Sequence, residues 1–150
     1  MLSAKLVRLI EDHAEELFRG LIDDLHHNDR TPSYHRIDRD SLRTRLYDVY
    51  HNLGRWLAHS TDENVEAAYM ALGRKRSSEG VPLSEVIYAL VVTKNHLLDF
   101  IRAHGLMNSA VELYQEQELY RLVGRFFDRA IYHTVRGYER DSSHPTKAAA

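Results

Sequence analysis

The chain has 150 residues, no cysteine, ten histidines and a formal net charge of −2. A chain of this length forms one domain with a single core. The lack of cysteine excludes disulfides, thiol catalysis and cysteine-ligated metal sites. The near-neutral charge argues against a nucleic-acid binder, and we recognise neither a signal peptide nor a membrane-spanning stretch of about 20 apolar residues. We therefore expect a soluble, cytoplasmic domain that binds neither nucleic acid nor membrane.

The first half of the chain predicts three helices. Apolar residues recur at steps of three and four, which is the helical period, and the alternation typical of strands is lacking. The pattern predicts a first helix over residues 3–25, a loop over residues 29–38 and a second helix over residues 40–59. Ser60 and Glu63 have the spacing of a capping box, which predicts a third helix that ends at Gly80.

The second half predicts two longer helices. Pro82 suits the entrance of a fourth helix over residues 83–104, whose broad apolar arc is typical of a central helix. Ser109 begins a second capping box at the start of a fifth helix over residues 109–139.

Together these elements predict an all-α fold, in which residues 1–140 form one bundle of about five helices. Globin-like packing is one arrangement that such a bundle can take. Residues 141–150 are polar and then alanine-rich, so we expect a disordered tail there.

One run between the third and fourth helices stands out, with the pattern Gly-x-x-Arg-x-x-Glu-Gly-Val-Pro-Leu-x-Glu-Val. The residues of interest in it are Gly73, Arg74, Arg76, Glu79, Gly80, Pro82 and Glu85. The run resembles the signature of the RsbRD-type N-terminal domains of RsbT co-antagonists, and the similarity extends over residues 10–135. This resemblance implies a helical bacterial stressosome or sensory module that forms a homodimer. It also implies an output partner of the STAS, histidine-kinase or helix-turn-helix type.

Physical chemistry accounts for the same run as a helix stop followed by a helix start. Gly80 permits the left-handed conformation that ends a helix, and the proline that follows fixes φ at the next entrance. Glu85 complements the positive end of the next helix dipole. Arg74 and Arg76 either pair with an acidic group such as Glu79 or form a solvated basic face.

None of the common catalytic templates occurs in the chain, so we expect no enzyme. The nucleophile elbow, the P-loop, the dinucleotide-binding turn, His-Glu-x-x-His and Glu-x-x-His are all missing. Asp-x-x-His places a carboxylate and an imidazole on one helical face, as a metal site or an acid–base pair requires. It occurs in the predicted helices at Asp23–His26, Asp24–His27 and Asp48–His51. These pairs lie at helix ends or polar faces, so we expect no metal site from them.

His13 and His96 differ from the other histidines because they fall on apolar helix faces. A buried imidazole can ligate a haem, bind a ligand or act as a pH switch. It can equally be a hydrogen-bonded core residue. We expect no resident cofactor. The alternative is a haem- or metal-binding sensor that uses both histidines, with His96 as the axial ligand.

Four aromatic residues are candidates for a pocket between helices or for ordinary core, namely Trp56, Tyr69, Phe100 and Phe126. The function that these observations favour is a non-enzymatic signalling input domain. We expect it to dimerise through its N-terminal helix or its fifth helix. It would sense a small molecule or a stress signal on behalf of an output domain or partner.

Overall fold

The computed structural model describes residues 2–59, 61–104 and 110–143, and within these ranges the chain is helical without a strand. The elements are α1 (Leu2–Asp12), α2 (Ala14–His27), the 3-10 turn η1 (Pro32–Tyr34), α3 (Arg39–His59), α4 (Asp62–Ser78), α5 (Leu83–Ala103) and α6 (Ala110–Ser142). This confirms the all-α prediction. Over the described part of the chain, no helix combines the length and the apolar character that a bilayer crossing requires.

The prediction of one first helix was wrong, because the segment forms two helices, α1 and α2. His13 lies between them with φ −124° and ψ 21°, and its side chain does not cap α2. The break lets the two helices pack on different neighbours, α1 on α3 and α2 on α5. The described residues therefore contain six α-helices, and globin-like packing stays a prediction.

Three other expectations concern helix boundaries. Ser60 and Ser109, the first residues of the two predicted capping boxes, lie outside the described residues. The N-cap of α4 is Thr61, whose side chain makes no capping hydrogen bond. α6 continues to Ser142, three residues past the predicted helix end at 139, and residues 144–150 of the predicted tail are outside the described ranges.

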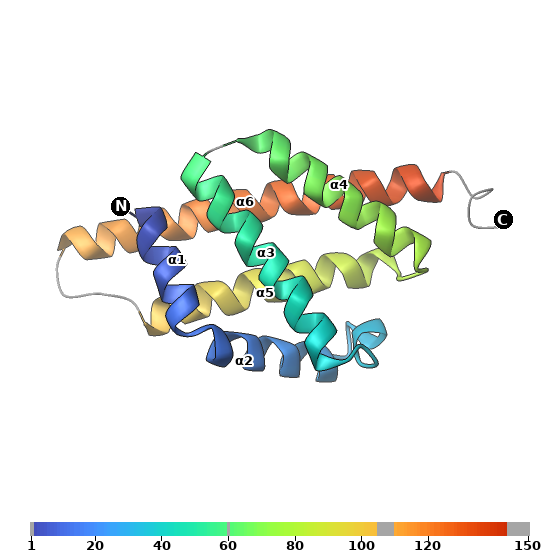
Figure 1. Cartoon of the computed structure of the whole chain (residues 1–150), viewed down its shortest axis with the longest axis horizontal. Helices are drawn as coiled ribbons and strands as arrows, with labels where there is room; N and C mark the ends of the chain where they lie inside the picture. Colours follow the sequence, from blue (N-terminus) through green and yellow to red (C-terminus); the bar gives the residue numbers. More distant parts are fainter. Residues whose placement is uncertain (1, 60, 105–109, 144–150) are drawn as a thin grey trace.

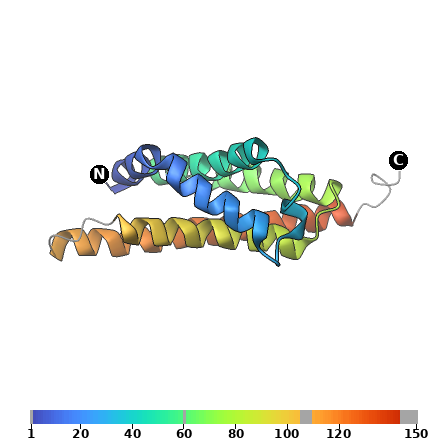
Figure 2. The same cartoon turned by 90° about the horizontal axis from the view of Figure 1, so that it is seen from below.

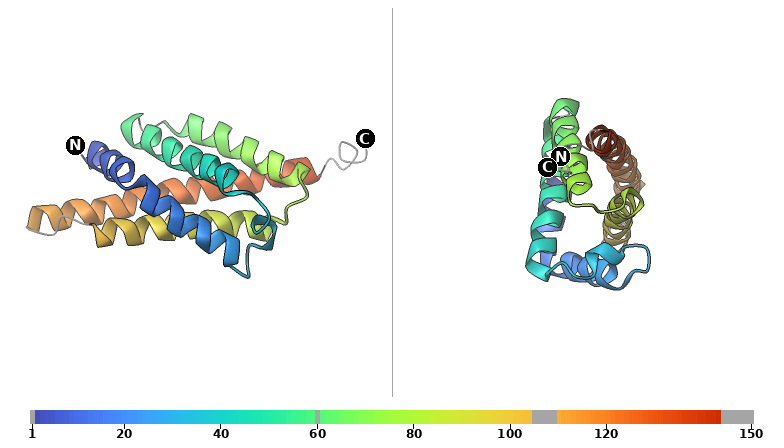
Figure 3. Two further views of the ribbon diagram at one scale, coloured as in Figure 1. Left: turned by 60° about the horizontal axis from the view of Figure 1, so that its bottom comes forward. Right: turned by 90° about the vertical axis from the view of Figure 1, so that its right-hand side faces the viewer.

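The longest helix sets the long axis of the molecule. α6 has 33 residues, which corresponds to about 50 Å at 1.5 Å per residue. α5 runs antiparallel beside it, and α1, α2 and α3 lie together on one side of this pair (Figures 1 and 2). Viewed along the long axis, the helices surround a central core (Figure 3). Fully buried side chains fill this core, among them Leu21, Leu53, Leu97, Val123, Phe126 and Phe127.

α4 and α6 approach each other so closely that their backbones touch. A Cβ atom on Gly73 would lie 2.1 Å from the carbonyl oxygen of Thr134, and one on Gly137 would lie 2.1 Å from that of Met70. Heavy atoms never approach to that distance without a covalent bond, so the crossing requires glycine on both helices. Gly73, the first residue of the Gly-x-x-Arg run, therefore permits the close crossing of α4 and α6.

Candidate functional site

The Gly-x-x-Arg run forms a junction at the end of the bundle where α4, α5, η1 and the last turns of α6 meet (Figure 1). We call residues 73–85 the signature junction. α4 ends at Ser78, and Gly80 follows its C-cap residue Glu79 with φ +75°, as expected for a helix stop. The Gly80 amide donates to the Ser77 carbonyl at 3.0 Å, and the Val81 amide donates to the Arg76 carbonyl at 3.1 Å. These two bonds close a helix that ends in a left-handed glycine.

Glu85 anchors the loop before α3 to the start of α5. Pro82 is the N-cap of α5 with φ −58°, and Glu85 follows in the first turn, where its charge suits the helix dipole. The Glu85 side chain is buried, and its carboxylate accepts hydrogen bonds from the Ser33 amide at 2.7 Å and from the Ser33 hydroxyl at 3.1 Å. The dipole argument from the sequence did not include this second role.

Of the two arginines in the run, Arg76 is buried and Arg74 is exposed. The Arg76 guanidinium donates to the Glu79 carboxylate at 3.0 Å, which is the pairing that the sequence offered. Arg45 on α3 lies nearby, and burial together with the positive charge of Arg76 lowers its pKa. Burial also raises the pKa of the neighbouring Tyr34 in η1. Two arginines and a phenol thus share the interior of the junction.

α6 joins the signature junction through one side chain. The Tyr138 hydroxyl donates a hydrogen bond of 2.6 Å to the Val81 carbonyl, in the turn between α4 and α5. Gly73 adds the backbone contact to Thr134 described above. The junction therefore fastens four elements to one another, and its buried Arg76 and Glu85 side chains are engaged in structural bonds.

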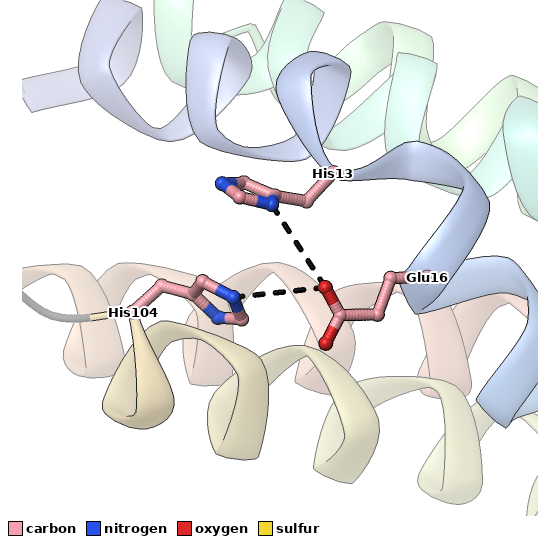
Figure 4. A group of neighbouring side chains, drawn as sticks. All are labelled: His13, Glu16 and His104. Atoms are coloured by element: carbon pink, nitrogen blue, oxygen red, sulfur yellow. Dashed lines mark ion pairs between the residues drawn. The ribbon is translucent and has the colours of Figure 1, made fainter.

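A second cluster lies at the opposite end of the bundle, where the break between α1 and α2 faces the last turn of α5 (Figure 4). His13 Nδ1 lies 3.9 Å from Glu16 Oε2, and His104 Nε2 lies 3.8 Å from the same oxygen. The two imidazole rings are 4.5 Å apart between centroids. Phe100 packs against both rings, at 5.5 Å from His13 and 4.2 Å from His104.

The family model described as the RsbT co-antagonist protein rsbRD N-terminal domain matches residues 15–148. The chain belongs to this family. It is therefore a regulatory domain of the stressosome type, as the signature predicted. Comparison with curated proteins and with solved structures returned no match. The family match starts after α1 and includes the whole signature junction.

In this RsbRD N-terminal domain, the two predicted inward histidines lie at different places. His96 on α5 is half-buried and does not point into the core. Its Nε2 lies 2.7 Å from the Asp24 carboxylate on α2. Burial pushes the pKa of Asp24 upward, but the hydrogen bonds from Asn28 and His96 outweigh this effect and leave it below the ordinary value. His13 belongs to the other cluster, so the two histidines do not form a common site.

The Asp-x-x-His spacing does not produce contacts within any of the three pairs. Asp23 pairs with Arg39, Asp24 bonds Asn28 and His96, and His51 stacks on Tyr47. His26 and His27 are bonded to the carbonyls of Ile37 and Asp23. At exposed helical positions, other partners satisfy these groups, as the weakness of i,i+3 pairs leads one to expect.

Three of the four aromatic candidates lie in the core, and the fourth lies beside His13 and His104. Trp56, Tyr69 and Phe126 pack on one another between α3, α4 and α6, with centroid distances of 5.9 and 5.8 Å around Phe126. The Trp56 indole donates to Asp62 at 2.9 Å. Phe100 lies elsewhere and contacts His13 and His104. The three packed residues are buried and do not line a common pocket, although Tyr69 alone also lines a partly polar cavity of about 610 Å³ between α3 and α4.

A cavity does exist at a place that the sequence did not suggest. It lies between α1, the start of α2 and α3, has a volume of about 300 Å³, and is lined mainly by apolar side chains. Its lining includes Leu6, Ile10, Phe18, Tyr50 and Leu57. Neither His13 nor His96 lines this cavity.

We call His13, Glu16 and His104 the histidine cluster. The sequence pattern singled out only His13, and it did not indicate Glu16 or His104 as site residues. His104 is the C-cap residue of α5, and its imidazole bonds the Phe100 carbonyl at 3.1 Å. His13 and His104 are 91 positions apart, so no local spacing in the sequence predicts that they lie close together in the structure. The break at His13 and the packing of α2 on α5 bring them together.

Proposed function

We propose that this chain is a non-enzymatic signalling input domain that works as a homodimer and passes its signal to an output partner. The observation that carries the proposal is the family match over residues 15–148. The signature junction supports it, because residues of the run form a structural connection between four elements. We propose an output partner of the STAS, histidine-kinase or helix-turn-helix type, as the sequence resemblance implied.

The first turns of α6 supply the dimer surface in this proposal. Val111, Leu113 and Tyr114 are 66%, 44% and 70% exposed, although apolar side chains of this size are commonly covered. This end of α6 extends beyond the neighbouring ends of α1 and α5 (Figure 1). A second copy of the chain can place the same end of its own α6 against it, which is how symmetric dimers bury a shared patch.

The signal in this proposal is a small apolar molecule that binds between α1 and α3. The cavity described there has a volume of about 300 Å³, the lower end of the range for small-molecule sites. Its apolar lining would bury the ligand, and α1 would respond directly because it forms one wall. The expected absence of a resident cofactor stays a prediction. Haem ligation by His96 would require breaking its bond to Asp24.

Sedimentation velocity across a range of concentrations tests the dimer. We expect a dimer for the unaltered chain and a monomer for Tyr114→Glu, because the new charge would be buried in the interface. Tyr132→Glu is the matched control, since Tyr132 is on the same helix and is 60% exposed. A monomer at every concentration, or a Tyr114→Glu variant that dimerises as well as the control, would contradict the proposed interface.

A further inference from the structure

We propose that His13, Glu16 and His104 bind a divalent transition-metal ion, with zinc the best match. Each residue offers one ligand atom, and the three atoms all lie within 4.8 Å of one another. Two imidazole nitrogens and one carboxylate oxygen are a ligand set that zinc accepts, with a fourth position left for water. Thiolates play no part in such a site, in keeping with a chain that has no cysteine.

The distances in the cluster leave room for an ion. Both contacts of Glu16 Oε2, 3.9 Å to His13 and 3.8 Å to His104, are too long for hydrogen bonds. A tetrahedral zinc ion with bonds of about 2.0–2.1 Å holds its ligand atoms about 3.4 Å apart. The three ligand atoms, which lie within 4.8 Å of one another, would therefore have to approach by up to about 1.4 Å to complete the coordination.

The orientation of His104 is the observation that separates this cluster from a chance grouping. The Phe100 carbonyl can only accept, so the His104 Nδ1 that lies 3.1 Å from it is the protonated nitrogen. Nε2 then carries the lone pair, and it is this atom that faces Glu16. Metal-bound histidines are held in the same way, with the second nitrogen donating to a backbone carbonyl.

The surroundings of the cluster favour ligation over a solvated ion pair. The Phe100 ring packs against both imidazoles and shields one side of them from water. His104 is 26% exposed and His13 is 38% exposed, so an ion can enter from the open side where Glu16 lies. The His13 side chain is free to ligate, because it does not cap α2.

Zinc at this place would join three pieces of backbone. His13 is the break between α1 and α2, Glu16 lies in the first turn of α2, and His104 follows α5. A bound ion would fix the angle at the break and hold it against the end of α5. Because the unfolded chain lacks the site, zinc would also stabilise the folded state.

Isothermal titration with zinc chloride tests the proposal on the full, untagged chain. We expect one zinc ion per chain, and a loss of affinity of about tenfold or more in both His104→Ala and Glu16→Ala. His59→Ala is the matched control, because His59 is exposed and outside the cluster. Glu16 has a 68% exposed side chain, so its removal leaves the fold intact and keeps the test valid if His104→Ala misfolds.

Titration with cobalt(II) gives an independent readout. Tetrahedral nitrogen and oxygen ligation produces visible absorption bands that a hexa-aquo ion lacks at that intensity. We expect these bands in the unaltered chain and in His59→Ala, and their loss in Glu16→Ala. Absence of zinc binding, or equal affinity in Glu16→Ala and His59→Ala, would overturn the site.

Discussion

Asp24 is a residue whose charge links two helices. Its carboxylate lies on α2 and bonds Asn28 at 3.0 Å and His96 of α5 at 2.7 Å. Because these bonds favour the charged form, the pKa of Asp24 is lower in the folded protein than in the unfolded chain. The carboxylate therefore stabilises the fold at pH values above its ordinary pKa. The stabilisation disappears as the pH falls through the folded-state pKa.

Asp24→Asn tests this effect at the scale of one residue. We expect the substitution to lower the free energy of unfolding by about 1 kcal/mol at pH 7 and to have little effect at a pH well below the folded-state pKa of Asp24, where both side chains are neutral. Urea unfolding at the two pH values measures it. Asp29→Asn is the control, because Asp29 is exposed. A loss of stability that is the same at both pH values would show that the charge is not responsible.

Residue roles that depend on neighbours in the chain were predictable from the sequence. The helix stop at Gly80 and the pairing of Arg76 with Glu79 both follow from local spacing. The bonds from Ser33 to Glu85 and the meeting of His13 with His104 depend on tertiary packing. No pattern in the sequence carries that information, because the partners are separated by other helices.

At the scale of elements, the crossing of α4 and α6 depends on Gly73 and Gly137, which carry only a hydrogen atom where other residues carry a side chain. A methyl group on Gly73 would lie 2.1 Å from the Thr134 carbonyl oxygen and 2.6 Å from the Tyr138 nitrogen. Both obstacles are backbone atoms, which cannot rotate aside. The two helices would have to separate to admit the methyl group, and the packed side chains on either side of the crossing would lose contact.

Gly73→Ala should therefore destabilise the fold by about 3 kcal/mol, at the upper end of overpacking effects. Gly124→Ala on α6 is the matched control, since nothing lies within 4 Å of an added Cβ there. Alanine is the better helix former, so we expect the control to gain up to about 1 kcal/mol. Chemical denaturation of both variants measures the difference. A Gly73→Ala variant as stable as the unaltered chain would mean that the helices do not touch in solution.

The helices themselves were largely predictable, because their apolar faces follow a period of 3.6. The break at His13 was missed since both α1 and α2 keep that period and neither glycine nor proline marks the change of direction. Its cause is tertiary, because α1 packs most extensively on α3 and α2 packs most extensively on α5, although α2 contacts α3 as well. A straight helix over residues 3–25 could not cover both neighbours.

At the scale of the whole molecule, we expect stability to be uneven. α4 and α6 share a backbone contact and lie along each other, whereas α1 is held mainly by Leu6, Leu9 and Ile10. α1 also precedes the part of the chain that matches the family. Regions with few buried apolar contacts open at low cost in free energy.

Hydrogen–deuterium exchange followed by mass spectrometry tests this expectation. Peptides from α1 should exchange well before peptides from the middle of α4 and from α6 around Thr134. Peptides from α5 serve as the internal reference, because that helix is buried along much of its length. Exchange in α1 as slow as that in α5 would contradict the expectation.

The glycine crossing also restricts how α6 can move. If α6 slid along α4 by one helical turn, Thr134 or Asp141 would replace Gly137 opposite the Met70 carbonyl, where no Cβ atom has room. The crossing therefore locks the register of the two helices and rules out a piston-like displacement of α6 along its axis.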